Sequence, residues 1–170
     1  MNILKLILAI LNLFRIEQAS VAKDIPPPTI YGQITSAKIK GLILTAFPQL
    51  KNSLDDVFVG RKIYDMTTVA EVKRFLKADG TDRMEYGEDF PKCVDYTRRI
   101  LGNMTIPGWW SLPKGDIWVK INGGHSVVVM ALYDNERDLK KGLYAIEGQN
   151  DVIELASEMF EDTEVIVTKW

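Results

Sequence analysis

The sequence holds one cysteine and one histidine, and these two side chains could together perform nucleophilic catalysis. Cys93 follows Pro91 and Lys92 where a segment with helical spacing of apolar residues begins. A thiol in the first turn of a helix meets unpaired amides and the positive end of the helix dipole, which favour the thiolate. Imidazole titrates near neutrality, so His125 could take the thiol proton and return it to a leaving group. The alternative for each is a structural role, since a lone cysteine is usually a small buried apolar residue.

A third polar group should orient the imidazole, and the segment that follows Leu143–Ile146 offers three. If the strand that begins at His125 pairs antiparallel with the strand that ends at Glu147, the two positions are neighbours. We therefore expect Glu147, Gln149 or Asp151 within reach of His125. The register of the pairing decides among them, and the sequence does not fix it.

Helices are expected before strands along the chain. Apolar periodicity predicts helices over 36–47, from a Thr68 cap to Asp79-Gly80, and from Cys93 to Met104. A short strand or turn is expected at 57–59. Alternating and apolar runs predict strands over 116–121, 125–133, 143–147, 152–155 and 164–170. This order is typical of an α+β fold with an antiparallel sheet.

The length of 170 residues and the apolar fraction of 46% predict one folded domain. Three consecutive prolines within 24–28 cannot continue a helix. We therefore divide the chain into an apolar N-terminal helix or targeting segment (1–22), a proline-rich linker (23–35) and a folded domain that carries the candidate catalytic pair (36–170). The apolar stretch within 1–16 is too short to span a bilayer. A signal peptide, which would imply secretion, a helix packed on the body or a partner, and membrane contact stay open for it.

Composition excludes several classes of function. The 21 basic and 23 acidic residues nearly balance, and no basic stripe indicates a nucleic-acid partner. One cysteine excludes an intrachain disulfide and a zinc site built from several thiolates, and one histidine excludes a His-rich metal site. Carboxylate and amide oxygens are abundant, which leaves a hard cation such as calcium as the metal class that the composition favours.

The order of several short motifs resembles the papain-like domain at the C-terminus of the Marasmius oreades agglutinin and its small relatives, many from bacteriophages. The resemblance covers 68–155 and is carried by Cys93–Tyr96, Ile106–Trp109, Gly115–Val119, His125 and Tyr144–Gln149. It implies a papain-like fold with N-terminal helices packed on a C-terminal antiparallel sheet.

The resemblance also implies roles for individual residues. Cys93 would be the nucleophile, His125 the base, and Glu147 the third polar member or a metal ligand. The agglutinin is a calcium-dependent cysteine protease, which implies calcium near Asp95, Glu147 and Gln149. Further candidates for the oxyanion site or the cleft are Tyr86, which lies seven positions before the cysteine, Gln149 and Trp109.

Three functions stay open on this evidence. The first is a cysteine-dependent hydrolase that acts on a peptide or protein substrate through an amide bond. The second is a catalytically silent phage, virion or host-interaction protein that uses the same fold for binding, and the Trp109-Trp110 pair would suit such a surface. The third is a CHAP-type peptidoglycan amidase, although Cys93 and His125 are closer in sequence than that pattern requires.

Overall fold

The computed structural model describes residues 24–52, 60–84, 92–120, 124–161, 163 and 165–169. Three predictions lie outside these residues: the N-terminal segment 1–22, the strand or turn at 57–59, and the role of Tyr86. None of the described helices is long and apolar enough to cross a membrane.

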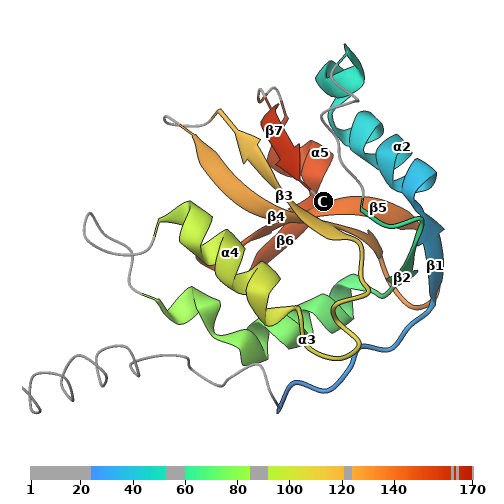
Figure 1. Cartoon of the computed structure of the whole chain (residues 1–170), viewed down its shortest axis with the longest axis vertical. Helices are drawn as coiled ribbons and strands as arrows, with labels where there is room; N and C mark the ends of the chain where they lie inside the picture. Colours follow the sequence, from blue (N-terminus) through green and yellow to red (C-terminus); the bar gives the residue numbers. More distant parts are fainter. Residues whose placement is uncertain are drawn as a thin grey trace, which may run out of the picture.

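The centre of the fold is a five-stranded antiparallel sheet (Figure 1). Its strands are β3 (Lys114–Val119), β4 (His125–Tyr133), β5 (Lys141–Glu147), β6 (Val152–Leu155) and β7 (Val165–Lys169). They are arranged in the order β6-β5-β4-β3-β7, and each neighbouring pair is antiparallel. Strand β4 is therefore central and lies between β5 and β3, with β6 and β7 at the edges.

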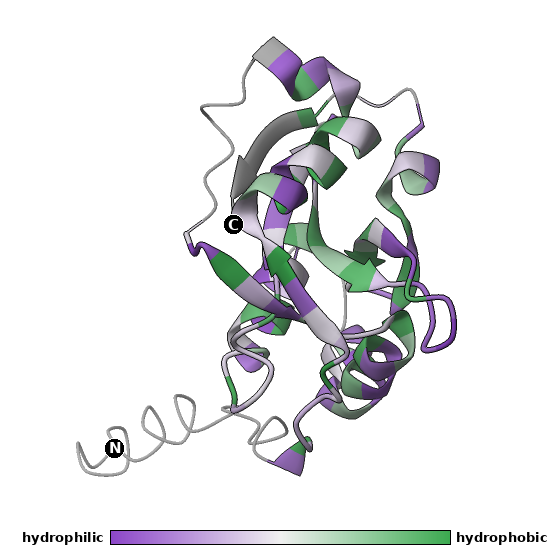
Figure 2. Cartoon of the chain, turned by 90° about the vertical axis from the view of Figure 1, so that its right-hand side faces the viewer, coloured by the Kyte–Doolittle hydropathy of each residue, from purple (hydrophilic) through white to green (hydrophobic). Residues whose placement is uncertain are grey.

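Strand β4 is hydrophobic from Val127 to Leu132 (Figure 2), and its side chains enter a core on each face of the sheet. Successive side chains of a strand point to opposite faces, so Val127 and Val129 join one core while Val128 and Met130 join the other. Helix α2 (Ser36–Ala46) contributes to the first core, and α3 (Val69–Asp79) and α4 (Cys93–Asn103) contribute to the second. Two hydrophobic cores therefore hold one sheet between helical layers.

Short elements complete the chain. Strands β1 (Gly32–Thr35) and β2 (Ile63–Met66) form a separate two-stranded antiparallel sheet. The 3-10 helices η2 (Pro48–Asn52) and η4 (Thr81–Arg83) follow α2 and α3, and a one-turn helix, α5 (Ala156–Met159), follows β6.

The helix ends follow the sequence signals. The Thr68 hydroxyl accepts a hydrogen bond from the Glu71 amide at 3.4 Å, which caps the start of α3. Gly80 ends the helix with φ +69°, a backbone conformation that glycine adopts without strain.

The α+β class, with helices first and an antiparallel sheet afterwards, is confirmed. The sequence analysis did not predict β1, which occupies the last four residues of the predicted linker, nor β2 or α5. Each has only four residues, which is too short to show a period. Strand β3 also begins two residues earlier than expected, directly after Pro113.

Candidate functional site

Cys93 is the first residue of α4 and is partly exposed. The preceding Lys92 has extended backbone angles, and its amide donates to Asp95 Oδ2 at 2.9 Å. The Asp95 carboxylate therefore caps the helix on which the thiol is placed. The thiol accordingly sits where the first amides of a helix lack intrahelical partners.

His125 begins β4 and Glu147 ends β5, so the antiparallel hairpin places them at the same end of the sheet. His125 Nε2 lies 2.5 Å from Glu147 Oε2, and their side chains are 22% and 19% exposed. The expectation that a polar group from this segment lies beside His125 is confirmed, and that group is Glu147. Because Nε2 is engaged, Nδ1 is the ring nitrogen left for a second partner.

One cavity of about 530 Å³ brings several of these side chains together. Four of the predicted site residues line it: Cys93, His125, Glu147 and Gln149. The remaining described wall consists of Gly124, Asn150, Val152, Glu154, Met159 and Phe160. Two segments that are distant in sequence, the start of α4 and the end of the β4–β5 hairpin, thus share one concave site.

Close packing holds α4 against this end of the sheet. The Thr97 hydroxyl donates to the Ser126 carbonyl at 2.9 Å, one residue after His125. A Cβ at Gly148 would lie 3.0 Å from Tyr96 Cβ and from Ile100 Cδ1, so only glycine lets the turn after Glu147 approach the helix without displacement. The two contacts fix Cys93 relative to the His125–Glu147 pair.

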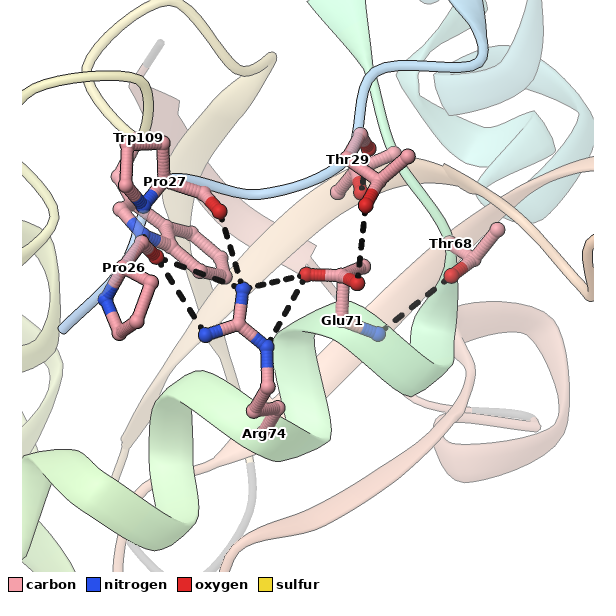
Figure 3. Close-up of polar contacts among 8 residues, drawn as sticks. Pro26, Pro27, Thr29, Thr68, Glu71, Arg74 and Trp109 are labelled. Carbon is pink, nitrogen blue, oxygen red and sulfur yellow. Dashed lines mark hydrogen bonds and ion pairs between the residues drawn. The ribbon is translucent and has the colours of Figure 1, made fainter.

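The structure places Trp109 in the core rather than in the cavity wall. Its side chain is fully buried, its ring lies 4.6 Å from the Phe75 ring, and its Nε1 donates to the Pro26 carbonyl at 2.9 Å (Figure 3). The adjacent Trp110 is 51% exposed and lies beneath the Arg61 guanidinium, 4.1 Å from the ring centroid.

Of the three residues expected near calcium, Glu147 and Gln149 line the cavity and Asp95 does not. Both carboxylate oxygens of Glu147 already accept hydrogen bonds, Oε2 from His125 and Oε1 from the Gln149 amide at 3.3 Å. Asp95 is engaged in capping α4 and does not line the cavity. Among the described residues, no group of three or more His, Cys, Asp or Glu side chains is placed to hold a metal ion.

Asp151, the third candidate partner of His125, belongs to a separate acidic cluster. Burial, and then the charges of Asp82 and Asp79, raise the pKa of Asp151 to about 6. One carboxylate oxygen of Asp151 and one of Asp82 are buried without a hydrogen-bond partner in the described part of the chain. The cluster surrounds the end of α3, not the cavity.

Sequence reasoning missed the wall formed by β6 and α5. Val152 and Glu154 were assigned to a strand but not to the site, and Met159 and Phe160 had no assigned element. The pairing of Val152 with Glu147 brings β6 to the cavity, and this register is not evident from the sequence.

No family model and no curated protein sequence matches the chain. Solved structures do match. A Polyporus squamosus lectin bound to a human-type influenza-binding epitope superposes with a TM-score of 0.61 at 14% identity, covering 81% of this chain and 49% of the lectin chain. The lectin PSL1a in complex with E-64 gives 0.62 at 16% identity, covering 81% and 51%.

The chain shares its fold with part of a fungal lectin. It spans about half the length of these lectin chains. Identities this low concern the fold alone, so the function must be argued from the site.

Proposed function

We propose that this protein is a cysteine-dependent hydrolase of peptide or amide bonds, with Cys93 as nucleophile, His125 as base and Glu147 as orienting residue. One observation carries the proposal: the thiol at a helix start lines the same cavity as an imidazole whose second nitrogen is bound by a carboxylate. Acyl transfer by a thiol uses a nucleophile, a base and an orienting group, and this cavity brings one side chain of each kind together.

The reaction begins when His125 Nδ1 removes the proton of the Cys93 thiol. The thiolate attacks the carbonyl carbon, and the carbonyl oxygen becomes an oxyanion. As the tetrahedral intermediate collapses, the imidazolium gives its proton to the departing amine and a thioester remains on Cys93. Water, deprotonated by His125, attacks the thioester, and the thiolate leaves and regains the proton.

Glu147 holds the imidazole in this cycle. Its bond to Nε2 favours the tautomer that keeps Nδ1 free, and its charge stabilises the imidazolium. Amides at the start of α4 and the Gln149 side chain are the donors that we assign to the oxyanion. Tyr86 stays a candidate for the same role.

Two further lines support the proposal. The motif order resembles the papain-like domain of the Marasmius oreades agglutinin, and the fold is similar to part of a lectin that was solved with E-64. E-64 is an epoxide that thiolates open, so it is a suitable probe for Cys93. Calcium stays a prediction from the resemblance, and no step above depends on it.

The test is the rate at which iodoacetamide alkylates Cys93 between pH 4 and 9, which reports this site alone because the chain has one cysteine. A thiolate paired with imidazolium reacts rapidly below pH 7. An ordinary cysteine thiol, whose pKa is near 8.5, is protonated at that pH and reacts slowly. We expect rapid alkylation below pH 7 in the native protein and slow alkylation in that pH range in His125→Ala. We also expect a covalent E-64 adduct of the native protein by mass spectrometry.

Glu158→Gln is the matched control for Glu147→Gln, because both remove one carboxylate and Glu158 lies on α5 outside the cavity lining. Glu147→Gln should slow alkylation near neutrality and Glu158→Gln should not. A rate that stays negligible until about pH 8 and ignores His125→Ala would contradict the hydrolase.

That outcome would favour the second candidate, a binding protein on the same fold. The observation in its favour is that the structural neighbours are lectins, one solved with a sialylated epitope. Screening of the native chain against glycans and peptides would then replace activity assays.

The amidase is tested by adding purified peptidoglycan to the same protein and following released amino groups.

A further inference from the structure

One carboxylate of the cavity wall, that of Glu154, has no partner among the described residues. Glu147 faces the cavity but is bound to His125. Glu154 also lines the cavity, is exposed, and makes no hydrogen bond or ion pair with other described residues. None of the described lining residues is Lys or Arg.

The sheet register orients Glu154 toward the site. Val152 pairs with Glu147 and Glu154 pairs with Ala145, and paired residues of antiparallel strands share a face. His125 lies on the same face, because Val127 and Val129 contribute to one core together with Ala145. Glu154 therefore stands on the same side of the sheet as the His125–Glu147 pair, on the edge strand β6.

Apolar side chains flank this carboxylate. Val152 precedes it on β6, and Met159 and Phe160 reach the cavity from α5 and the residue after it. Phe160 is nearly buried and packs 6.4 Å from the Phe47 ring, which fixes that part of the wall. An apolar wall that ends in one negative charge suits an arginine or lysine side chain, whose methylene stem packs on carbon and whose head needs an anion.

We infer that Glu154 selects substrates with a basic side chain next to the bond that Cys93 attacks, with Val152, Met159 and Phe160 holding its stem. The role of Glu154 in selecting substrates rests on the proposed function. The binding of a basic side chain at this subsite does not, and it can be measured without turnover. Because the Glu154 carboxylate is exposed, it contributes moderately to the affinity for a basic side chain. An uncharged isostere of that side chain should bind about threefold to tenfold more weakly than the basic one.

The experiment therefore measures binding, not turnover. Nα-acetyl-arginine N-methylamide and its citrulline counterpart, which has the same shape without the charge, are titrated into the Cys93→Ala chain, and the Met159 methyl resonance is followed by NMR. We expect the arginine probe to shift this resonance and to bind about fivefold more tightly than citrulline. Glu154→Gln should abolish the preference, and Glu158→Gln should leave it unchanged.

Three results would overturn the inference: no shift with the arginine probe, equal affinity of the two probes, or an equal loss in Glu154→Gln and Glu158→Gln, which would mean a general field of negative charge. Failure of the hydrolase is seen separately. If Cys93 alkylates slowly while the arginine preference is found, the cavity binds basic side chains without cleaving; if alkylation is rapid and the preference is absent, the hydrolase has another specificity.

Discussion

At the scale of single residues, three of the polar side chains singled out by type, those of His125, Glu147 and Asp95, make a contact that explains them. The Glu147 carboxylate holds His125, and the Asp95 carboxylate holds the first turn of α4. Type alone did not separate these roles, since both residues were expected near a metal. The partner of each carboxylate separates them, and the partner depends on the register and on the helix start.

Asp79 offers a test of buried charge that is independent of the cavity. Its carboxylate accepts hydrogen bonds from the Thr81 hydroxyl and from Asn103 Nδ2, the latter at 2.5 Å. Burial nevertheless raises the pKa of Asp79, more strongly than these bonds lower it. The folded protein thus keeps the Asp79 proton to a higher pH than the unfolded chain, and ionisation of Asp79 costs stability as the pH rises above 3.8.

Asp79→Asn removes this ionisation while keeping the shape of the side chain. We expect the free energy of unfolding of the variant, relative to the native protein, to increase as the pH rises above 3.8 and to level off once Asp79 is ionised in the folded protein. Urea denaturation followed by tryptophan fluorescence measures it at each pH. Asp24→Asn, which removes an exposed carboxylate, should show no such trend, and a flat difference for Asp79→Asn would refute the account.

At the scale of elements, the site depends on how closely α4 approaches the end of β5. Gly148 lies in the turn between β5 and β6, against Tyr96 and Ile100 of α4. Tyr96 Cβ belongs to a rigid part of the helix, so an added methyl group there must displace either the helix or the turn. Displacement changes the position of Cys93 relative to His125.

Gly148→Ala should therefore destabilise the fold by about 1–2 kcal/mol and slow the alkylation of Cys93 at neutral pH. Gly102→Ala is the matched control, because an added Cβ at that position of α4 meets nothing within 4 Å and alanine favours helix. Chemical denaturation and the iodoacetamide rate are measured for both. Native stability and native rate in Gly148→Ala would mean that this approach does not position the thiol.

The elements also show what the sequence can and cannot predict. The helix beginning at Cys93 and the strands of 125–133 and 152–155 were predicted with their observed starts, because apolar periodicity and turn residues are local signals. Strands β1 and β2 were not, since each is stabilised by a partner about 30 residues away and by few residues of its own. The β6–α5 wall of the cavity was missed for the same reason: its place depends on pairing with β5.

At the scale of the whole molecule, the sheet separates two cores that serve different parts of the protein. The core beneath α3 and α4 also receives the segment before β1, where Ile25 is buried. This segment is held by Trp109 Nε1, which donates to the Pro26 carbonyl, and by the Arg74 guanidinium, which donates to the Pro27 carbonyl at 3.1 Å and to Glu71 (Figure 3). Gly108 admits the segment, because a Cβ there would lie 2.7 Å from Pro27 Cβ.

These contacts lie away from the cavity, so stability and chemistry should be separable. Trp109→Phe keeps an aromatic ring against Phe75 but removes the bond to Pro26 and part of the buried indole. We expect a loss of about 2–3 kcal/mol in the free energy of unfolding, since the carbonyl loses its donor and a void forms. The rate of Cys93 alkylation in the folded protein should stay unchanged.

Trp110→Phe is the matched control, because the same substitution at the adjacent, half-exposed ring removes no hydrogen bond donated by the indole among the described contacts. It should change the free energy of unfolding by less than about 1 kcal/mol. Both variants are measured by urea denaturation and by alkylation well below the midpoint. Slower alkylation of Cys93 in folded Trp109→Phe would mean that packing in the core beneath α3 and α4 affects the reactivity of the thiol, and that the two layers of this fold act as one unit.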